Sequence, residues 1–181
     1  MGQGRRDCDH RLVSSPPLTP LAVAVLHVDR NPERILQIAC GNGDGALFLA
    51  REFPRARVRG VDPSVEAIHS AVDRVGLDPE GRIAFKTGDA AALPYPEDFF
   101  DLVAQVDSLP HPAEVVRVLR PGGHVVLASE LRPRGLARMR ARRLRDGLER
   151  RGVELVQADA AGDGAFYVGR LRAPTDSAAP K

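Results

Sequence analysis

The 181-residue sequence has no tryptophan, two methionines and two tyrosines, and only two lysines (Lys86 and Lys181) against 24 arginines. Its two cysteines, Cys8 and Cys40, do not suggest a disulfide framework, which favours a reducing, cytoplasmic setting. No apolar run approaches the ~20 residues that span a bilayer, and the polar stretch 1–12 lacks the apolar core of a signal peptide. No cluster of His, Cys and Asp has the spacing of metal ligands, so we expect no metal site and no membrane contact.

Positive charge is concentrated in one segment. The formal net charge is only +2, but residues 132–151 hold nine arginines against Asp146 and Glu149, a local net charge of +7. An apolar stripe at helical spacing runs through the same segment: Leu136, Met139, Leu144 and Leu148. This pattern favours a helix that packs on a sheet and exposes a basic face. The alternative is a contact surface for RNA, an acidic partner or a carrier protein. Because no aromatic residue interleaves the arginines, we do not expect nucleic acid as a partner.

Most of the chain alternates short apolar runs with helix-like segments. The length suits one domain, which we place at residues 19–173, between a flexible segment 1–18 and a disordered tail 174–181. We expect Thr19 to cap a short helix that runs to about Val28. Expected strands lie at 35–39, 58–61, 83–85, 102–106, 124–128, 153–156 and 166–171; expected helices at 45–53, 65–75, 113–119 and 135–151. The alternation predicts an α/β fold with a mostly parallel sheet, closed by a hairpin.

A glycine-rich loop follows the first expected strand. Gly41 and Gly43 would allow a sharp turn and a close approach of the backbone to a ligand. Asp62 ends the next strand, where a carboxylate can accept hydrogen bonds from a ribose diol. The segment 41–46 also satisfies the dinucleotide pattern G-x-G-x-x-G/A, with Asp62 about 20 residues further on. The loop alone therefore leaves open a nicotinamide cofactor, another nucleotide, or a turn without a ligand.

Two downstream motifs favour one of these readings. Gly88–Pro96 is followed by Phe100–Val103, and Arg117–Gly123 follows later. With the glycine loop and Val61–Ser64, their order resembles the class I S-adenosylmethionine (SAM)-dependent methyltransferases, especially the small-molecule branch, over about residues 34–128. The resemblance implies a Rossmann-like, doubly wound sheet of seven strands in the order 3-2-1-4-5-7-6, with the last strand antiparallel. Dehydrogenases do not carry the last two motifs, so a nicotinamide cofactor becomes the minor reading.

The resemblance also implies a cofactor site for SAM, which leaves as S-adenosyl-L-homocysteine. Gly41 and Gly43 would approach its amino-acid part. Asp62 would hold the ribose hydroxyls with Pro63 beside the adenine, while Asp89 and the backbone N–H of Ala90 would contact the adenine edge. The full expected set is Gln37, Ala39, Gly41, Gly43, Asp62, Pro63, Asp89, Ala90 and Gln105. Asp101 is expected to be structural, as the cap of a turn before its strand.

Two departures from the family pattern affect what we expect. Gln37 stands where the family has Asp or Glu, and Ala39 where it has Gly. Because a neutral amide replaces a charged acceptor, SAM affinity should fall by about 1 kcal/mol or more. Only fifteen residues separate Asp101 from Arg117, about seven fewer than in close relatives, and the missing stretch usually shapes the substrate pocket. We therefore expect an open substrate site, or one completed by a partner protein, in a monomer or homodimer.

Methyl transfer is an in-line displacement, for which the protein mainly binds, aligns and desolvates the reactants. A general base is needed only where the nucleophile must lose a proton. Asp107 and His111 follow the fourth strand and are the candidate catalytic residues, although His111, between two prolines, also fits a plain loop residue. The sequence thus predicts SAM-dependent methylation of an O, N or C nucleophile on a small-molecule substrate. The alternatives are a non-catalytic or vestigial SAM-binding subunit that supports a partner and, more weakly, an RNA-associated methyltransferase.

Overall fold

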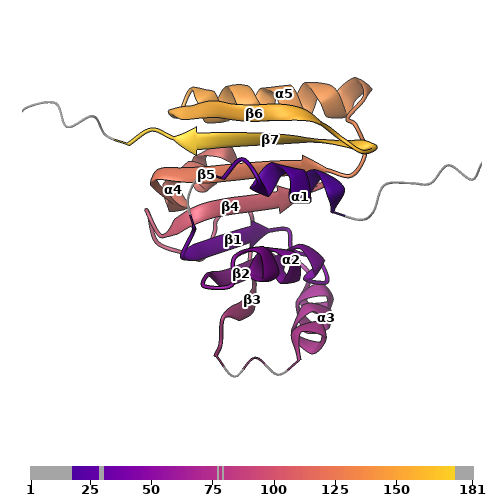
Figure 1. Cartoon of the computed structure of the whole chain (residues 1–181), viewed down its shortest axis with the longest axis vertical. Helices are drawn as coiled ribbons and strands as arrows, with labels where there is room; N and C mark the ends of the chain where they lie inside the picture. Colours follow the sequence, from indigo (N-terminus) through magenta and orange to yellow (C-terminus); the bar gives the residue numbers. More distant parts are fainter. Residues whose placement is uncertain (1–17, 29–30, 77, 79, 174–181) are drawn as a thin grey trace, which may run out of the picture.

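The computed structural model describes residues 18–28, 31–76, 78 and 80–173. A single sheet with the strand order β3-β2-β1-β4-β5-β7-β6 forms the centre of the fold (Figure 1). The strands are β1 (Arg34–Ile38), β2 (Arg57–Asp62), β3 (Ile83–Thr87), β4 (Phe100–Val106), β5 (Leu119–Ser129), β6 (Val153–Ala161) and β7 (Gly164–Leu171). Neighbours among β1–β5 are parallel, and β7 is antiparallel to both β5 and β6. The predicted strand order and antiparallel last strand are confirmed.

Helices cover both faces of this sheet. They are α1 (Thr19–Val25), α2 (Asp44–Glu52), α3 (Val65–Val75), α4 (Pro112–Val118) and α5 (Gly135–Glu149). Side chains of α1 and α2 share one buried cluster with Leu102, whereas α4 and α5 share a second cluster with Val103 on the opposite face. The central strands are therefore buried on both sides, as expected for a parallel sheet. No helix in the described part of the chain is long and apolar enough to cross a membrane.

The start of α1 differs from the prediction. Thr19 is the first helical residue rather than the cap, and the cap position belongs to Leu18, whose φ is 63°. The backbone N–H of Leu18 donates to Glu130 Oε1 at 2.9 Å, so a long-range bond to the end of β5 fixes the entry into the helix. The predicted cap was wrong because this tertiary contact, which local sequence does not reveal, sets the first turn. Residues 1–17 and 174–181, predicted as flexible and disordered, lie outside the described residues.

Asp101 is structural, as expected, but it lies within β4 and joins strands rather than capping a turn. Its Oδ2 accepts the backbone N–H groups of Glu33 at 3.0 Å and Arg34 at 2.9 Å, and its Oδ1 accepts Arg120 Nη1 at 2.9 Å. These contacts fix the amino ends of β1 and β4. The opposite, carboxyl edge of the parallel strands is where ligands bind in open α/β sheets.

Candidate functional site

A cavity of about 710 Å³ lies at the carboxyl ends of β1 and β4, beside the first turn of α2. Three of the predicted cofactor residues, Gln37, Ala39 and Gly41, line it. Gly45 and Asp107 also line it. The structure therefore brings the first glycine motif and one candidate base to a single hollow.

Gln37 presents its side chain from β1 against the start of α2. The residue is 3% exposed, and a Cβ built on Gly45 would lie 2.1 Å from Gln37 Nε2. The absent side chain at position 45 is thus what leaves room for the amide. Among the described residues, Gln37 Oε1 is buried without a hydrogen-bond partner. A buried acceptor of this kind costs free energy unless a donor reaches it, and it lies in the cavity wall.

Three residues of the glycine loop have a left-handed backbone conformation: φ is 52° at Ala39, 52° at Gly41 and 86° at Gly43. A Cβ at Gly41 would meet no atom within 4 Å, consistent with its place on the open cavity. At Gly43 a Cβ would lie 2.9 Å from Phe85 Cζ, so this glycine allows the loop to pack on β3. The two predicted glycines therefore differ in what they face: one a hollow, the other the protein core.

Asp62 holds the glycine loop from the end of β2. Its Oδ2 accepts the Gly41 N–H at 2.9 Å, and its Oδ1 accepts the Ser64 N–H at 3.0 Å. A carboxylate oxygen can accept a further bond, so the buried side chain retains capacity for a diol. Pro63, beside it, is exposed. Burial, and secondarily the charge of Asp62, raises the pKa of the Cys40 thiol to about 12, so Cys40 is neutral at physiological pH.

The remaining predicted cofactor residues lie outside the lining of this cavity. Asp89 is exposed and forms a turn, with Oδ1 accepting the Ala91 N–H at 2.8 Å, and the half-buried Ala90 packs against the core. Gln105 is 1% exposed between Ile38 and Leu127 in the sheet, and neither of its amide atoms has a hydrogen-bond partner among the described residues. Their contacts with a cofactor stay predictions.

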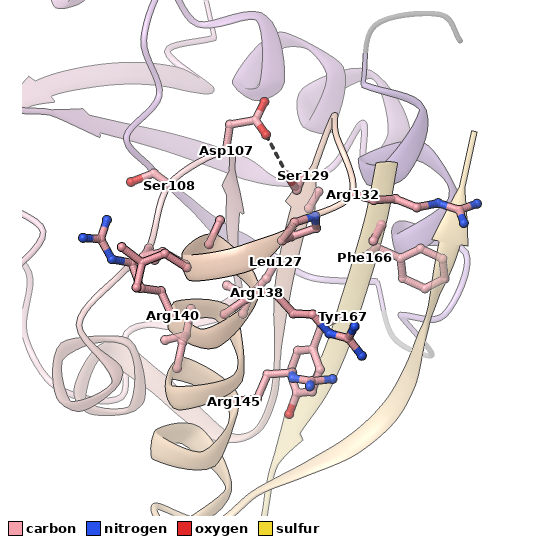
Figure 2. Close-up of a pocket in the computed structure, with 18 residues that line it drawn as sticks. Asp107, Ser108, Leu127, Ser129, Arg132, Arg138, Arg140, Arg145, Phe166 and Tyr167 are labelled. Atoms are coloured by element: carbon pink, nitrogen blue, oxygen red, sulfur yellow. Dashed lines mark hydrogen bonds between the residues drawn. The ribbon is translucent and has the colours of Figure 1, made fainter. Parts of the chain in front are cut away.

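A second cavity, of about 640 Å³, lies between α5 and the ends of β4, β5 and β7 (Figure 2). Asp107 lines this cavity as well as the first. It has a φ of 52°, and its Oδ1 accepts Ser129 Oγ at 3.1 Å and the Glu130 N–H at 2.9 Å. Its Oδ2 accepts no hydrogen bond from the residues that the structure describes. One carboxylate oxygen is thus anchored and the other is available.

The structure separates the two candidate bases. His111 is exposed, precedes the first turn of α4 and lies outside the lining of both cavities. No group of three or more His, Cys, Asp or Glu side chains within the described ranges could hold a metal ion. Of the two candidate bases, Asp107 lines both cavities and His111 lines neither.

The wall of the second cavity combines two aromatic residues that the sequence did not suggest with arginines of the basic segment 132–151, which it did. Phe166 and Tyr167 come from β7, and four arginines come from α5 and the segment before it: Arg132, Arg138, Arg140 and Arg145. Burial raises the pKa of Tyr167 to about 12, with Glu149 adding to the effect and Arg145 opposing it. The phenol is therefore neutral and cannot serve as the base. The apolar stripe on α5 was the available signal, but only the strand order shows that β7 lies opposite it.

Comparison with known proteins agrees with this geometry. Residues 35–123 match the family model described as a methyltransferase domain. Over 114 residues the chain is 39% identical to a phthiotriol/phenolphthiotriol dimycocerosates methyltransferase of Mycobacterium ulcerans, covering 59% of this chain and 41% of that protein. A fatty-acid O-methyltransferase of Mycolicibacterium smegmatis is 38% identical over 113 residues, covering 59% and 40%. The chain thus spans about two fifths of the length of the curated relatives that it matches.

Among solved structures, the fold is similar to that of geranyl diphosphate C-methyltransferase from Streptomyces coelicolor, in complex with Mg²⁺, geranyl diphosphate and S-adenosyl-L-homocysteine. The TM-score is 0.69 at 12% identity, over 82% of this chain and 78% of that one. At this identity the likeness concerns the fold. The chain is thus similar to methyltransferases over residues 35–123 and has the fold of the class I SAM-dependent methyltransferases.

Proposed function

We propose that this domain binds SAM in the cavity lined by Gln37 and Gly41, and transfers its methyl group to a small-molecule nucleophile held in the cavity under α5. The observation that carries the proposal is the position of Asp107, which lines both cavities at the end of β4. A group that must contact both reactants has to lie where their sites meet. Relatives that methylate phthiotriol dimycocerosates and fatty acids support a small-molecule acceptor.

The residues of the first cavity fit the cofactor. Gln37 Oε1 is a buried acceptor without a partner among the described residues, and the ammonium group of the methionine part is a donor of suitable chemistry. Asp62 lies outside the lining but binds Gly41 of the wall, and it has carboxylate capacity left for ribose hydroxyls after binding two backbone N–H groups. Gly41 offers backbone without a side chain at the wall. When bound, SAM supplies a methyl group already activated by its sulfonium.

In this proposal the chain itself supplies alignment and a proton acceptor. Asp107 Oδ1 is anchored by Ser129 Oγ and the Glu130 N–H, which orients the carboxylate. Its Oδ2 takes the proton that a hydroxyl or amine nucleophile loses as the new bond to carbon forms. Tyr167, with its raised pKa, remains protonated in the wall. A general base of this kind contributes roughly 10²–10⁴-fold to the rate.

Calorimetric titration of SAM into the purified chain tests the cofactor site. We expect saturable binding, weakened roughly tenfold in Gln37→Ala because a hydrogen bond to a charged group is lost. Absence of heat with SAM and with S-adenosyl-L-homocysteine would refute the proposal for this chain.

The base is tested by turnover, followed as S-adenosyl-L-homocysteine formed with a panel of hydroxylated lipids. Asp107→Asn should retain SAM binding and lose at least about 10²-fold in rate. Asp98→Asn is the matched control, since Asp98 is also an exposed aspartate with positive φ, but lies before β4 rather than after it. Equal loss in both variants would count against a specific role for Asp107.

One observation favours the second candidate, a SAM-binding subunit that supports a partner enzyme. Gln37 is a neutral amide at a position where the resembling family carries an acid, so cofactor affinity is expected to be weak. SAM binding without turnover on any acceptor, in the wild type and in Asp107→Asn alike, would favour that function over catalysis by this chain.

A further inference from the structure

The cavity under α5 is strongly basic. Arg132, Arg138, Arg140 and Arg145 line it, against the single carboxylate of Asp107. None of the four arginines has an ion-pair partner within the described part of the chain. Some arginines elsewhere do: Arg117 pairs with Glu114 at 2.7 Å and Arg120 with Asp101 at 2.9 Å. Guanidinium groups gathered at a hollow without counter-charges are suited to bind an anion.

The same cavity has an apolar wall. Leu127 and Ala128 come from β5, Ala165 and Phe166 from β7, and Leu136, Ala141 and Leu144 from α5. Leu136 is 60% exposed although it faces this hollow, so its side chain is only partly covered by protein. Cavities of this size with a largely apolar wall and a few polar groups are typical of small-molecule sites.

The charges lie at different places along the cavity. Figure 2 shows Asp107 near the ends of β4 and β5, whereas Arg145 lies by Tyr167, further along α5. Arg138 and Arg145 are two helical turns apart, so they share a face over a rise of about 10 Å. The apolar side chains of Leu127 and Ala141 belong to the wall of the same hollow. A molecule that fills the cavity therefore meets the carboxylate of Asp107 at one end and reaches Arg138 and Arg145 further along α5 (Figure 2).

We infer that the acceptor is a small amphipathic anion: it has a protic group at Asp107, an apolar body against β5 and α5, and a carboxylate, sulfate or phosphate at Arg138 and Arg145. The inference deepens the proposed function by naming the substrate class, and it rests on that function for the transfer step. Binding of the anion needs only this cavity. RNA is the less suitable occupant, because the one tyrosine at the basic wall is 4% exposed and offers little ring surface for stacking.

The test uses 10-hydroxydecanoate, with 1,10-decanediol as the uncharged counterpart, titrated calorimetrically into the wild-type chain below the critical micelle concentration. We expect the acid to bind at least roughly tenfold more tightly than the diol, because charge-assisted hydrogen bonds to guanidinium are lost in the diol. Arg138→Gln and Arg145→Gln should each weaken binding of the acid by about the same factor and leave binding of the diol unchanged. All these arginines are exposed, so the substitutions should not disturb the core.

Arg142→Gln and Arg143→Gln are the matched controls, because both residues are exposed on α5 and lie outside the cavity lining. They should bind the acid as the wild type does. Equal loss in these controls, equal binding of acid and diol, or no saturable binding of the acid would each overturn the inference. It would also be overturned if the substitutions at 138 and 145 weakened only the binding of a single-stranded RNA. Titration of SAM is a separate experiment, so failure of the cofactor site is distinguishable from failure of this one.

Discussion

Replacing Gly45 by alanine isolates a contact that shapes the cavity proposed to bind SAM. The added Cβ would lie 2.1 Å from Nε2, 2.9 Å from Cδ and 3.1 Å from Oε1 of Gln37, so the whole amide has to move. Gln37 is 3% exposed, and the space open to its amide is the cavity that it lines. Overpacking of this kind costs about 1–3 kcal/mol of folding free energy. For a chain of this size, each kcal/mol lowers the melting temperature by roughly 2–4 °C.

The sign of the effect should depend on residue 37. Alanine is favoured over glycine within a helix by up to about 1 kcal/mol, and Gly45 lies in the first turn of α2. In the wild type the clash outweighs this gain, so Gly45→Ala should destabilise the chain. In a Gln37→Ala background the clashing amide is absent, so the same substitution should be neutral or stabilising. The coupling between the two positions should therefore be at least about 1 kcal/mol.

Urea unfolding of the four chains in this cycle, followed by circular dichroism, measures the coupling. SAM titration of Gly45→Ala adds a second readout, because a displaced Gln37 should also weaken binding. The reasoning is refuted if Gly45→Ala destabilises both backgrounds equally, since the packing partner would then not be Gln37. It is also refuted if the single variant is as stable as the wild type.

Three further predictions concern charged and titrating groups. Gln37→Glu should tighten SAM binding by roughly tenfold, because a charged acceptor replaces a neutral one. An unchanged affinity in calorimetry would show that residue 37 does not contact the ammonium group of SAM. Glu114→Gln should destabilise the chain at pH 7 by about 1–2 kcal/mol. Its hydrogen bond with Arg117 lowers the pKa of Glu114 below the ordinary 4.5. The stabilisation by Glu114 is therefore present above pH 4.5 and is lost as the pH falls through the lower pKa of the folded state. A difference in urea midpoint between the two chains that persisted in strong acid would contradict this. Cys40, with its pKa raised to about 12, should resist iodoacetamide at pH 9 in the folded chain and react in urea, as read by peptide mass spectrometry.

The sequence predicted the sheet because its signals are local. Ile35–Ile38 and Leu102–Val106 are short apolar runs between polar segments, and such runs mark strands whatever surrounds them. The turn from β1 into α2 was equally readable, since Gly41 and Gly43 take the left-handed conformation that glycine permits. Strand order came from the resemblance to a family rather than from the pattern. The structure confirms that order.

The contacts that decide the site are long-range, and these the sequence did not show. Gly43 reads as a ligand-approach glycine, yet a Cβ there would strike Phe85, which is more than forty residues away in the chain. Gly45 was read only as part of a helix start, although its missing side chain accommodates Gln37. The basic cavity needs β7 beside β5, which brings Tyr167 opposite Arg145. Such partners depend on topology, not on neighbouring residues.

Asp107 follows β4 in a short connection, where the sequence predicts an open substrate region. Long-range hydrogen bonds, rather than a longer loop, hold it in place. Asp107 Oδ1 binds Ser129 Oγ and the Glu130 N–H at the end of β5, and Glu130 Oε1 in turn accepts the N–H of Leu18 at the start of α1. Leu18, Asp107 and Glu130 all line the cavity proposed to bind SAM. The two bonds use different parts of Glu130, because Asp107 binds its backbone N–H and Leu18 binds its carboxylate. Glu130→Ala should therefore weaken SAM binding by releasing Leu18 from the cavity wall, while Asp107 keeps its position.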